Sequence, residues 1–184
     1  MPWPWSRKSD PKDYYKNYVA DEVPTPLNLK LTEFISSFTP DSAFEFGCGT
    51  GKNLVLLKES IGDVSGIELS QKAVERCIAK GLDVVQGDEQ TLLNMSKTVD
   101  IAFTCSVLDH IEEVDDIITK LKSMARKAVV LCETDDIVAK FYYAHDYESY
   151  GLAIACDGYT YHSKAEQGGD GATYRIYAWI PPIT

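Results

Sequence analysis

The sequence predicts an α/β protein with a doubly wound, mostly parallel sheet of seven strands that ends in an antiparallel β-hairpin. Three observations predict this class. An apolar segment ending at Phe46 enters a loop that contains Gly47, Gly49 and Gly51, and an apolar segment compatible with a helix follows. Strand-like and helix-like segments then alternate as far as Cys132. Two β-rich segments around a glycine-rich turn end the sequence, which is typical of a hairpin.

Apolar periodicity and the residues that start or stop helices place the individual elements. Strands are expected at residues 42–46, 64–67, 83–86, 99–104, 128–132, 152–162 and 172–180. Helices are expected at residues 13–20, 25–38, from 54 onward, 71–81, 89–94 and 111–125. Thr25 is expected to cap the second of these helices and Ser70 the fourth. The prolines among residues 1–12 discourage helix, so an irregular arm is expected there.

Composition excludes several classes of protein. The apolar content of 45% and charged content of 25% are typical of a globular domain. No apolar run approaches the roughly 20 residues of a membrane span, and no signal peptide is recognisable, so a cytoplasmic protein is expected. The net charge of −10 argues against a nucleic-acid partner held through its phosphates. The five cysteines form no C-x-x-C pair, so reduced thiols and no metal site are expected.

The spacing of the glycines indicates which ligand the loop binds. A dinucleotide-binding loop reads G-x-G-x-x-G, and its third glycine would stand where this chain has Lys52. Here the pattern is G-x-G-x-G, and Glu45 precedes it by two residues, which is unfavourable beside a pyrophosphate but suits an ammonium group. The run E-F-G-C-G-T-G at residues 45–51 resembles the first motif of the class I S-adenosylmethionine-dependent methyltransferases, in particular small members of methyltransferase types 11 and 12.

This resemblance covers residues 42–133 and implies a Rossmann-like methyltransferase fold with S-adenosylmethionine as methyl donor and S-adenosylhomocysteine as product. It also implies one domain, with an N-terminal arm or lid at 1–24, a cofactor-binding core at 25–135 and an acceptor-side segment at 136–184. A second similarity, carried by the glycine loop and the tyrosine-containing hairpin, is to small methylases associated with surface-sugar and pseudaminic-acid gene sets. The segment after Asp88 departs from the family, since it lacks the common Leu-Pro-Phe.

The resemblance assigns cofactor-binding residues to the carboxyl ends of the strands, where open α/β sheets bind ligands. Glu68 is expected to accept from both ribose hydroxyls, with Leu69 against the adenine. Asp88 matches the position that takes the adenine amino group, and Glu89 would add a backbone N–H. The residues expected around the methionine portion and the transferring methyl are Glu45, Gly47, Cys48, Gly49, Thr50, Gly51, Asn53, Cys105, Ser106, Val107 and His110.

Two histidines are the candidate catalytic residues. Methyl transfer from a sulfonium is an in-line displacement, so the protein mainly orients the nucleophile. A hydroxyl acceptor also has to lose a proton, which favours a histidine of near-neutral pKa. His110, in the fourth motif, is expected to act as base or as a shaping group, and His145 is the second candidate, with a loop histidine without a role as its alternative. Asp109 is expected to cap the helix that follows it.

Tyrosines are the candidate substrate contacts. Tyr14, Tyr15 and Tyr18 lie along one side of the first expected helix, which in small members of the class forms part of a lid, and ordinary core packing is the alternative. Tyr147 follows the fifth strand, where class members build the acceptor pocket.

The sequence therefore predicts methyl transfer from S-adenosylmethionine to an oxygen or nitrogen of a small molecule, such as a sugar or another metabolite. The small-molecule acceptor is the expected partner, and neither a nucleic acid nor a membrane is expected to bind. The protein is expected to be a monomer or a homodimer. A protein methyltransferase and a non-catalytic cofactor-binding partner subunit remain alternatives.

Overall fold

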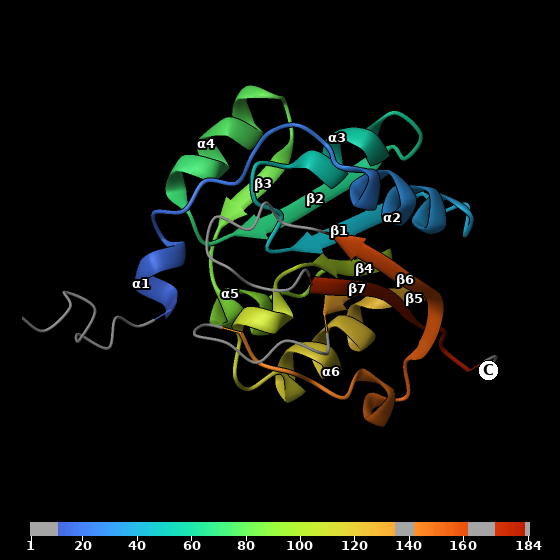
Figure 1. Ribbon diagram of the computed structural model, residues 1–184. Helices are drawn as coiled ribbons and strands as arrows, with labels where there is room; N and C mark the ends of the chain where they lie inside the picture. The colour runs from blue at the N-terminus through green and yellow to red at the C-terminus, as the bar shows by residue number, and fades with distance from the viewer. Residues whose placement is uncertain (1–10, 135–141, 162–171, 183–184) are drawn as a thin grey trace, which may run out of the picture.

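A seven-stranded sheet with helices on both faces forms the structure, a computed structural model that describes residues 11–134, 142–161 and 172–182 (Figure 1). The strand order is β3-β2-β1-β4-β5-β7-β6. The first five strands run parallel, whereas β7 pairs antiparallel with β5 and β6 antiparallel with β7. The predicted fold class, a mostly parallel doubly wound sheet with a C-terminal hairpin, is confirmed.

The bounds of the elements agree with the sequence prediction for most of the chain. The strands are β1 (Ser42–Phe46), β2 (Asp63–Glu68), β3 (Asp83–Gln86), β4 (Val99–Cys105), β5 (Ala125–Thr134), β6 (Ala153–Tyr161) and β7 (Ala172–Trp179). The helices are α1 (Pro11–Tyr15), α2 (Pro26–Ser36), α3 (Lys52–Lys58), α4 (Gln71–Ala79), α5 (Glu89–Leu93) and α6 (Asp115–Met124), with 3₁₀ turns η1 (Leu108–His110) and η2 (Tyr147–Tyr150). The glycine-rich turn of the hairpin lies outside the described residues.

Two predicted helix starts and one predicted cap need correction. The prediction that helix begins at residue 111 is wrong: residues 108–110 form η1, Ile111 is extended, and α6 starts only at Asp115. Asp109 therefore does not cap α6. The first helix begins at Pro11, because a proline in the first turn lacks only an N–H that has no helical partner, and it ends at Tyr15 rather than at residue 20.

The two predicted caps behave differently. Thr25 and Asn28 form a reciprocal pair at the start of α2: the Thr25 hydroxyl accepts from the Asn28 N–H (3.4 Å), and the Asn28 side chain accepts from the Thr25 N–H (2.8 Å). Ser70 occupies the N-cap position of α4, but its hydroxyl makes no capping hydrogen bond. Its N–H instead donates to Glu68 (2.8 Å), which ties the start of α4 to the tip of β2.

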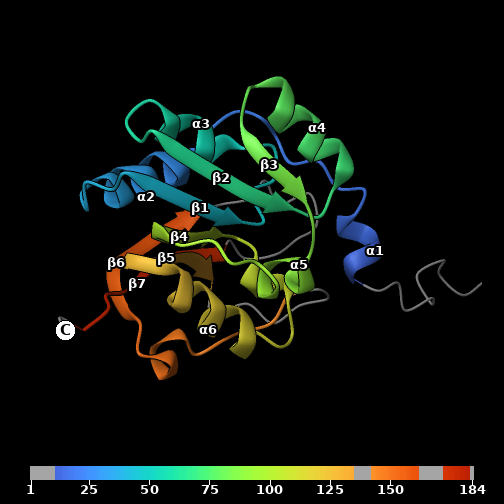
Figure 2. The same cartoon turned by 180° about the vertical axis from the view of Figure 1, so that it is seen from behind.

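Each face of the sheet carries its own apolar core. Alternate residues of β1 point to opposite faces, so Ala43 lies in the cluster under α2, α3 and α4, whereas Phe44 and Phe46 lie in the cluster under α5 and α6. Figure 2 shows from behind the helices that cover the two faces of the sheet. No helix among the described residues is long and apolar enough to cross a membrane.

The sheet reverses its winding between β1 and β4, since β2 and β3 extend it to one side and β4 and β5 to the other. In open α/β sheets the carboxyl ends of the two strands at such a reversal flank the ligand-binding crevice. The segments that leave these ends are the glycine loop after Phe46 and the turn after Cys105, and α1 lies near the same edge of the sheet in both views (Figures 1 and 2). The topology therefore places the predicted motifs at one site.

Replacement of Leu31 by Ala should lower the free energy of unfolding by about 2–5 kcal/mol, because this α2 side chain is fully buried and its removal leaves a cavity. Leu29, on the same helix but 53% exposed, provides the matched control, and its replacement by Ala should change stability by less than about 0.5 kcal/mol. Urea unfolding of both variants measures the difference. Equal losses would contradict the packing of α2 described above.

Candidate functional site

The loop after β1 has a backbone conformation that leaves no room for a side chain at its first and last glycines. Gly47, Gly49 and Gly51 all have positive φ, at 74°, 54° and 79°. A Cβ on Gly47 would lie 2.5 Å from a Val107 methyl group, and a Cβ on Gly51 would lie 2.4 Å from Leu82. At Gly49 the nearest atom would be 3.7 Å away. The loop thus packs tightly at both ends and keeps its middle open to a ligand.

A chain of side-chain hydrogen bonds ends at a buried carboxylate beneath this loop. The Asn28 amide donates to Asn53 (2.8 Å), and the Asn53 amide donates to Oε1 of Glu45 (2.6 Å). Glu45 is 1% exposed, and its Oε2 has no hydrogen-bond partner in the described part of the chain. Burial raises the pKa of Glu45 well above its usual value, although the Asn53 bond opposes the shift. An unsatisfied carboxylate oxygen here fits the ammonium group that the sequence predicts.

Glu68, at the carboxyl end of β2, is bound to the loop itself. Its Oε2 accepts from the Gly49 N–H (2.7 Å), and its Oε1 accepts from the Ser70 N–H (2.8 Å). Burial raises the pKa of this carboxyl, and the two backbone bonds oppose the rise. Each carboxylate oxygen retains a second lone pair, so the group can still accept from two hydroxyls.

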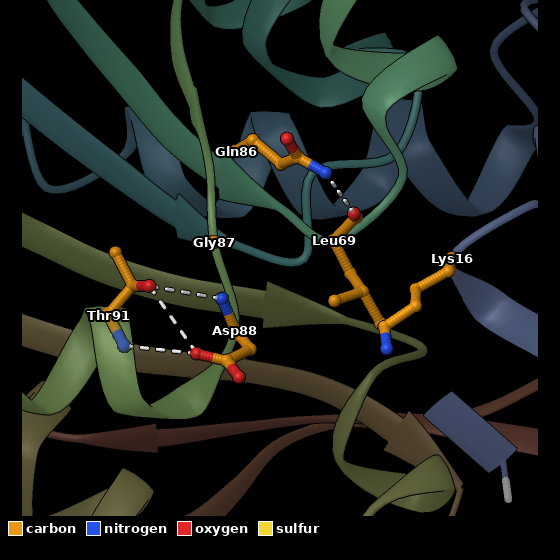
Figure 3. Close-up of a pocket in the computed structure, with 6 residues that line it drawn as sticks. All are labelled: Lys16, Leu69, Gln86, Gly87, Asp88 and Thr91. Atoms are coloured by element: carbon orange, nitrogen blue, oxygen red, sulfur yellow. Dashed lines mark hydrogen bonds between the residues drawn. The ribbon is translucent and has the colours of Figure 1, made fainter. Parts of the chain in front are cut away.

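A pocket of about 280 Å³ opens next to the carboxyl ends of β2 and β3, with Leu69 and Asp88 among the residues that line it (Figure 3). The Leu69 side chain supplies an apolar wall, and the Leu69 carbonyl accepts from the Gln86 amide (3.3 Å). Asp88 lies opposite and caps α5 by accepting from the N–H groups of Gln90 and Thr91. Gly87 passes so close to Thr91 that a Cβ would lie 2.6 Å from it. This pocket lies where the sequence predicts the adenine.

The N-terminal segment that contains α1 contacts the glycine loop, α4 and the start of α5. Lys12 forms ion pairs with Asp88 of the pocket and with the neighbouring Glu89, while Lys16 lines the pocket. Further along, the Thr50 hydroxyl of the glycine loop donates to the carbonyl of Asp21 (3.1 Å). Glu22 forms ion pairs with Arg76 and Lys80 of α4. The N-terminal segment is therefore fastened to the loop, to α4 and to α5.

A buried glutamate that the sequence interpretation missed organises the turn after β4. Glu133 is fully buried near the end of β5 and accepts from the Thr104 hydroxyl (2.6 Å) and from the N–H groups of Val107 (3.0 Å) and Leu108 (3.2 Å). Burial and then the nearby Asp109 raise its pKa well above the usual value. The signal in the sequence was an acid directly after the continuous apolar run that ends at Cys132.

The same turn brings Asp109 and His110 together with tyrosines from distant segments. His110 Nε2 lies 3.5 Å from Oδ1 of Asp109, which is fully buried. The His110 ring contacts the rings of Tyr15 and Tyr142, each at a centroid distance of 4.6 Å. Burial raises the pKa of Asp109, and His110 and His145 oppose the rise. Ser106, with φ 55°, shares a 3.0 Å hydrogen bond with the Tyr174 hydroxyl.

Of the predicted catalytic and substrate residues, His110 and Tyr15 contact each other beside the turn after β4, whereas the other four make different contacts. His145 Nε2 faces the carbonyls of Leu108 (3.1 Å) and Ile111 (2.9 Å), so this histidine holds the η1 turn. Tyr147 is 1% exposed and packs in the core against the Tyr177 ring. Tyr14 and Tyr18 are about half exposed, and their rings stack at 5.9 Å on the N-terminal segment.

The remaining predicted cofactor residues line the loop or its edges. Cys48 is buried, and its N–H donates to the Ile67 carbonyl (3.1 Å). Cys105 ends β4 directly opposite Cys132 of β5. Val107 packs against Gly47, so the turn after β4 contacts the glycine loop. Among the described residues, no group of three or more His, Cys, Asp or Glu side chains is arranged to hold a metal ion.

Comparison with known proteins identifies similar sequences and folds. A family model described as methionine biosynthesis protein MetW matches residues 32–134, more than half of the chain. N-methyltransferase NodS from Bradyrhizobium japonicum WM9, crystallised with S-adenosylhomocysteine, superposes with a TM-score of 0.70 at 13% identity, over 95% of this chain and 100% of NodS. None of the curated protein sequences matches the chain.

Two further structures share the fold. Magnesium protoporphyrin IX methyltransferase (ChlM) from Synechocystis PCC 6803, also with bound S-adenosylhomocysteine, superposes with a TM-score of 0.69 at 16% identity, over 91% of this chain and 96% of that one. A SAM-dependent methyltransferase from Archaeoglobus fulgidus superposes with a TM-score of 0.65 at 14% identity, over 83% of this chain and 91% of that one. The predicted resemblance to class I methyltransferases is confirmed at the level of the fold, and the similarity to surface-sugar methylases stays a prediction.

Replacement of Gly47 by Ala should lower the free energy of unfolding by at least about 2 kcal/mol, because it adds a strained positive φ to a clash with Val107. Gly62 is the control, since a Cβ there would have no neighbour within 4 Å and its φ is not in the positive range. Its replacement by Ala should change stability by less than about 0.5 kcal/mol. Urea unfolding distinguishes the two, and a stable Gly47→Ala protein would contradict the described loop.

Replacement of Glu45 by Gln should make the ligand-free protein less sensitive to rising pH. A carboxyl whose folded pKa is raised contributes stability that is fully present below its unfolded pKa of about 4.3 and is lost as pH rises through the folded pKa. The unfolding free energy of Glu45→Gln relative to wild type should therefore increase with pH, by up to about 1.4 kcal/mol per unit. The exposed Glu59, replaced by Gln, provides the control. A difference that does not vary with pH would show that Glu45 ionises normally.

Proposed function

The chain belongs to the MetW family of methionine biosynthesis proteins, and on that premise we propose that it transfers a methyl group from S-adenosylmethionine to an oxygen or nitrogen of a small-molecule acceptor. One observation carries the proposal. A loop with glycine at three of its five positions is hydrogen-bonded to Glu68 and follows the strand that carries the unsatisfied oxygen of Glu45. NodS and ChlM, two methyltransferases of the same fold with bound S-adenosylhomocysteine, support the same ligand.

The residues of the loop and its neighbours would hold the three parts of the cofactor. The backbone between Gly47 and Gly51 would contact the methionine portion, and the free oxygen of Glu45 would accept from its ammonium group. Glu68 would accept from the ribose hydroxyls, and the pocket between Leu69 and Asp88 would take the adenine. When bound, the cofactor supplies an electrophilic methyl carbon on a sulfonium.

On the acceptor side, the chain would orient the nucleophile and exclude water. His110 is the candidate for a base or a positioning group, since it lies in the turn that contacts the glycine loop through Val107. The rings of Tyr15 and Tyr142 fix the plane of its imidazole. His145, which is bonded to the backbone of this turn, would support the geometry instead of reacting. A cytoplasmic location and a monomeric or homodimeric state complete the proposal.

Titration with S-adenosylhomocysteine, followed by calorimetry, tests the cofactor site. Replacement of Glu68 by Gln should weaken binding by roughly 1–3 kcal/mol, about ten- to hundredfold, because a neutral amide loses charge-assisted hydrogen bonds to the ribose. The exposed Glu59, replaced by Gln, matches the charge change and should leave affinity unaltered. If wild-type protein fails to bind the compound, the proposed function is wrong.

Incubation with methyl-labelled S-adenosylmethionine and fractionated extract then separates the alternatives. Label in a small-molecule fraction is the expected result and would identify the acceptor. Label in protein would instead favour a protein methyltransferase. Cofactor binding without label in any fraction would favour a non-catalytic partner subunit.

A further inference from the structure

Two carboxylates are fully buried beside the turn after β4, and the fold satisfies only one of them. Glu133 accepts four hydrogen bonds of 3.2 Å or less, from the Thr104 hydroxyl and from two backbone N–H groups, one of which reaches both carboxylate oxygens. Asp109 is equally buried, yet neither of its oxygens has a hydrogen-bond partner among the described residues. A buried carboxylate without hydrogen bonds is costly when charged, and the charged group recorded nearest to Asp109 is the His110 imidazole, whose Nε2 lies 3.5 Å from Oδ1.

The groups near Asp109 include aromatic rings, the histidines His110 and His145 and the buried carboxyl of Glu133. Tyr15 and Tyr142 contact the neighbouring His110, and the Tyr174 hydroxyl lies on Ser106 of the same turn. Burial, together with the negative charge of Asp109, raises the pKa of these three tyrosines, so they remain neutral hydrogen-bonding groups. Aromatic faces beside a carboxylate attract a cation more strongly than a neutral group.

Among the described residues, the cationic groups recorded near this carboxylate are the histidines His110 and His145. No lysine or arginine in the described ranges forms an ion pair with Asp109, and the nearest nitrogen recorded is Nε2 of His110 at 3.5 Å. Asp109 lies two residues after Val107, which packs on Gly47 of the glycine loop. The unsatisfied carboxylate therefore lies on the acceptor side of the proposed cofactor site.

We propose that the methyl acceptor carries a basic amino group, which binds as an ammonium ion against the Asp109 carboxylate between Tyr15 and Tyr142 and is the atom that is methylated. This inference rests on the proposed function. It narrows the acceptor from an oxygen or nitrogen compound to an amine. A neutral alcohol would give Asp109 a hydrogen bond but would leave its charge uncompensated, whereas an ammonium ion supplies both.

The reaction balances with the groups present. The bound ammonium R–NH₃⁺ gives one proton to Asp109 and becomes R–NH₂. The nitrogen lone pair then forms the N–CH₃ bond as the bond between methyl carbon and sulfur breaks, and its electron pair stays on sulfur. The products are R–NH₂⁺–CH₃ and S-adenosylhomocysteine, and the proton on Asp109 passes to solvent. His110, 3.5 Å from Asp109, is placed to relay that proton.

A pair of probes with the same shape and different charge tests the inference. Choline is cationic, and 3,3-dimethylbutan-1-ol is its neutral counterpart. Ligand-observed NMR titration of each, with the protein saturated with S-adenosylhomocysteine at pH 8, measures binding without turnover. Choline should bind at least tenfold more tightly than the alcohol. Equal affinities, or tighter binding of the alcohol, would overturn the inference.

Replacement of Asp109 by Asn keeps the shape of the side chain and removes its charge. It should reduce choline affinity at least tenfold and leave the affinity for 3,3-dimethylbutan-1-ol unchanged. Replacement of the exposed Asp116 by Asn makes the same change in net charge and should leave both affinities unchanged. Equal losses in the two variants would assign the effect to overall charge and would contradict the site.

The binding of S-adenosylhomocysteine distinguishes a failure of the proposed function from a failure of the amine inference alone. If the wild-type protein does not bind it, the proposed function fails. If it binds with normal affinity to wild type and to Asp109→Asn, but choline shows no preference over the alcohol, only the amine inference fails. Thermal unfolding of Asp109→Asn shows that the variant is folded, and its melting temperature should equal or exceed that of wild type because a costly buried charge is removed.

Discussion

The contact between Gly47 and Val107 is the constraint on which the site depends. A Cβ on this glycine would lie 2.5 Å from a valine methyl, so the loop after β1 and the turn after β4 meet with no spare volume. Because these two segments leave the strands at which the sheet reverses its winding, their contact fixes how far the proposed cofactor side lies from the acceptor side. Glu68 secures the loop from β2, and Glu133 secures the turn from β5.

The sequence predicted the elements that depend only on interactions between residues close together in the chain. The glycine loop, the Thr25 cap and the apolar run of β5 each form where their own residues require it. The start of α6 could not be predicted, because the turn at 108–110 is held by Glu133 from β5 and by His145 from beyond the chain segment at 135–141. Likewise, Asp109 seemed suited to a helix cap, but long-range packing buries it instead.

The site itself was predicted unevenly for the same reason. Residues of the cofactor loop and the strand tips each directly follow a parallel strand, so the order of the strands was enough to predict that they lie at one edge of the sheet. The acceptor side is assembled from α1, the turn after β4, the segment around Tyr142 and β7, which are separated by tens of residues. Nothing in the sequence near Tyr147 indicated that η2 would turn this tyrosine into the core, or that Tyr142 would contact His110.

Helix α1 has one further consequence. It spans five residues, and within that turn Lys12 pairs with Asp88 of the pocket and with the neighbouring Glu89 while Tyr15 contacts His110. One short helix thus contacts both halves of the site. If occupancy of one half shifts α1 and so alters affinity in the other, thermodynamic linkage requires the reverse effect to be equal in free energy. Ligand cooperativity in this protein would then be carried by a single helical turn.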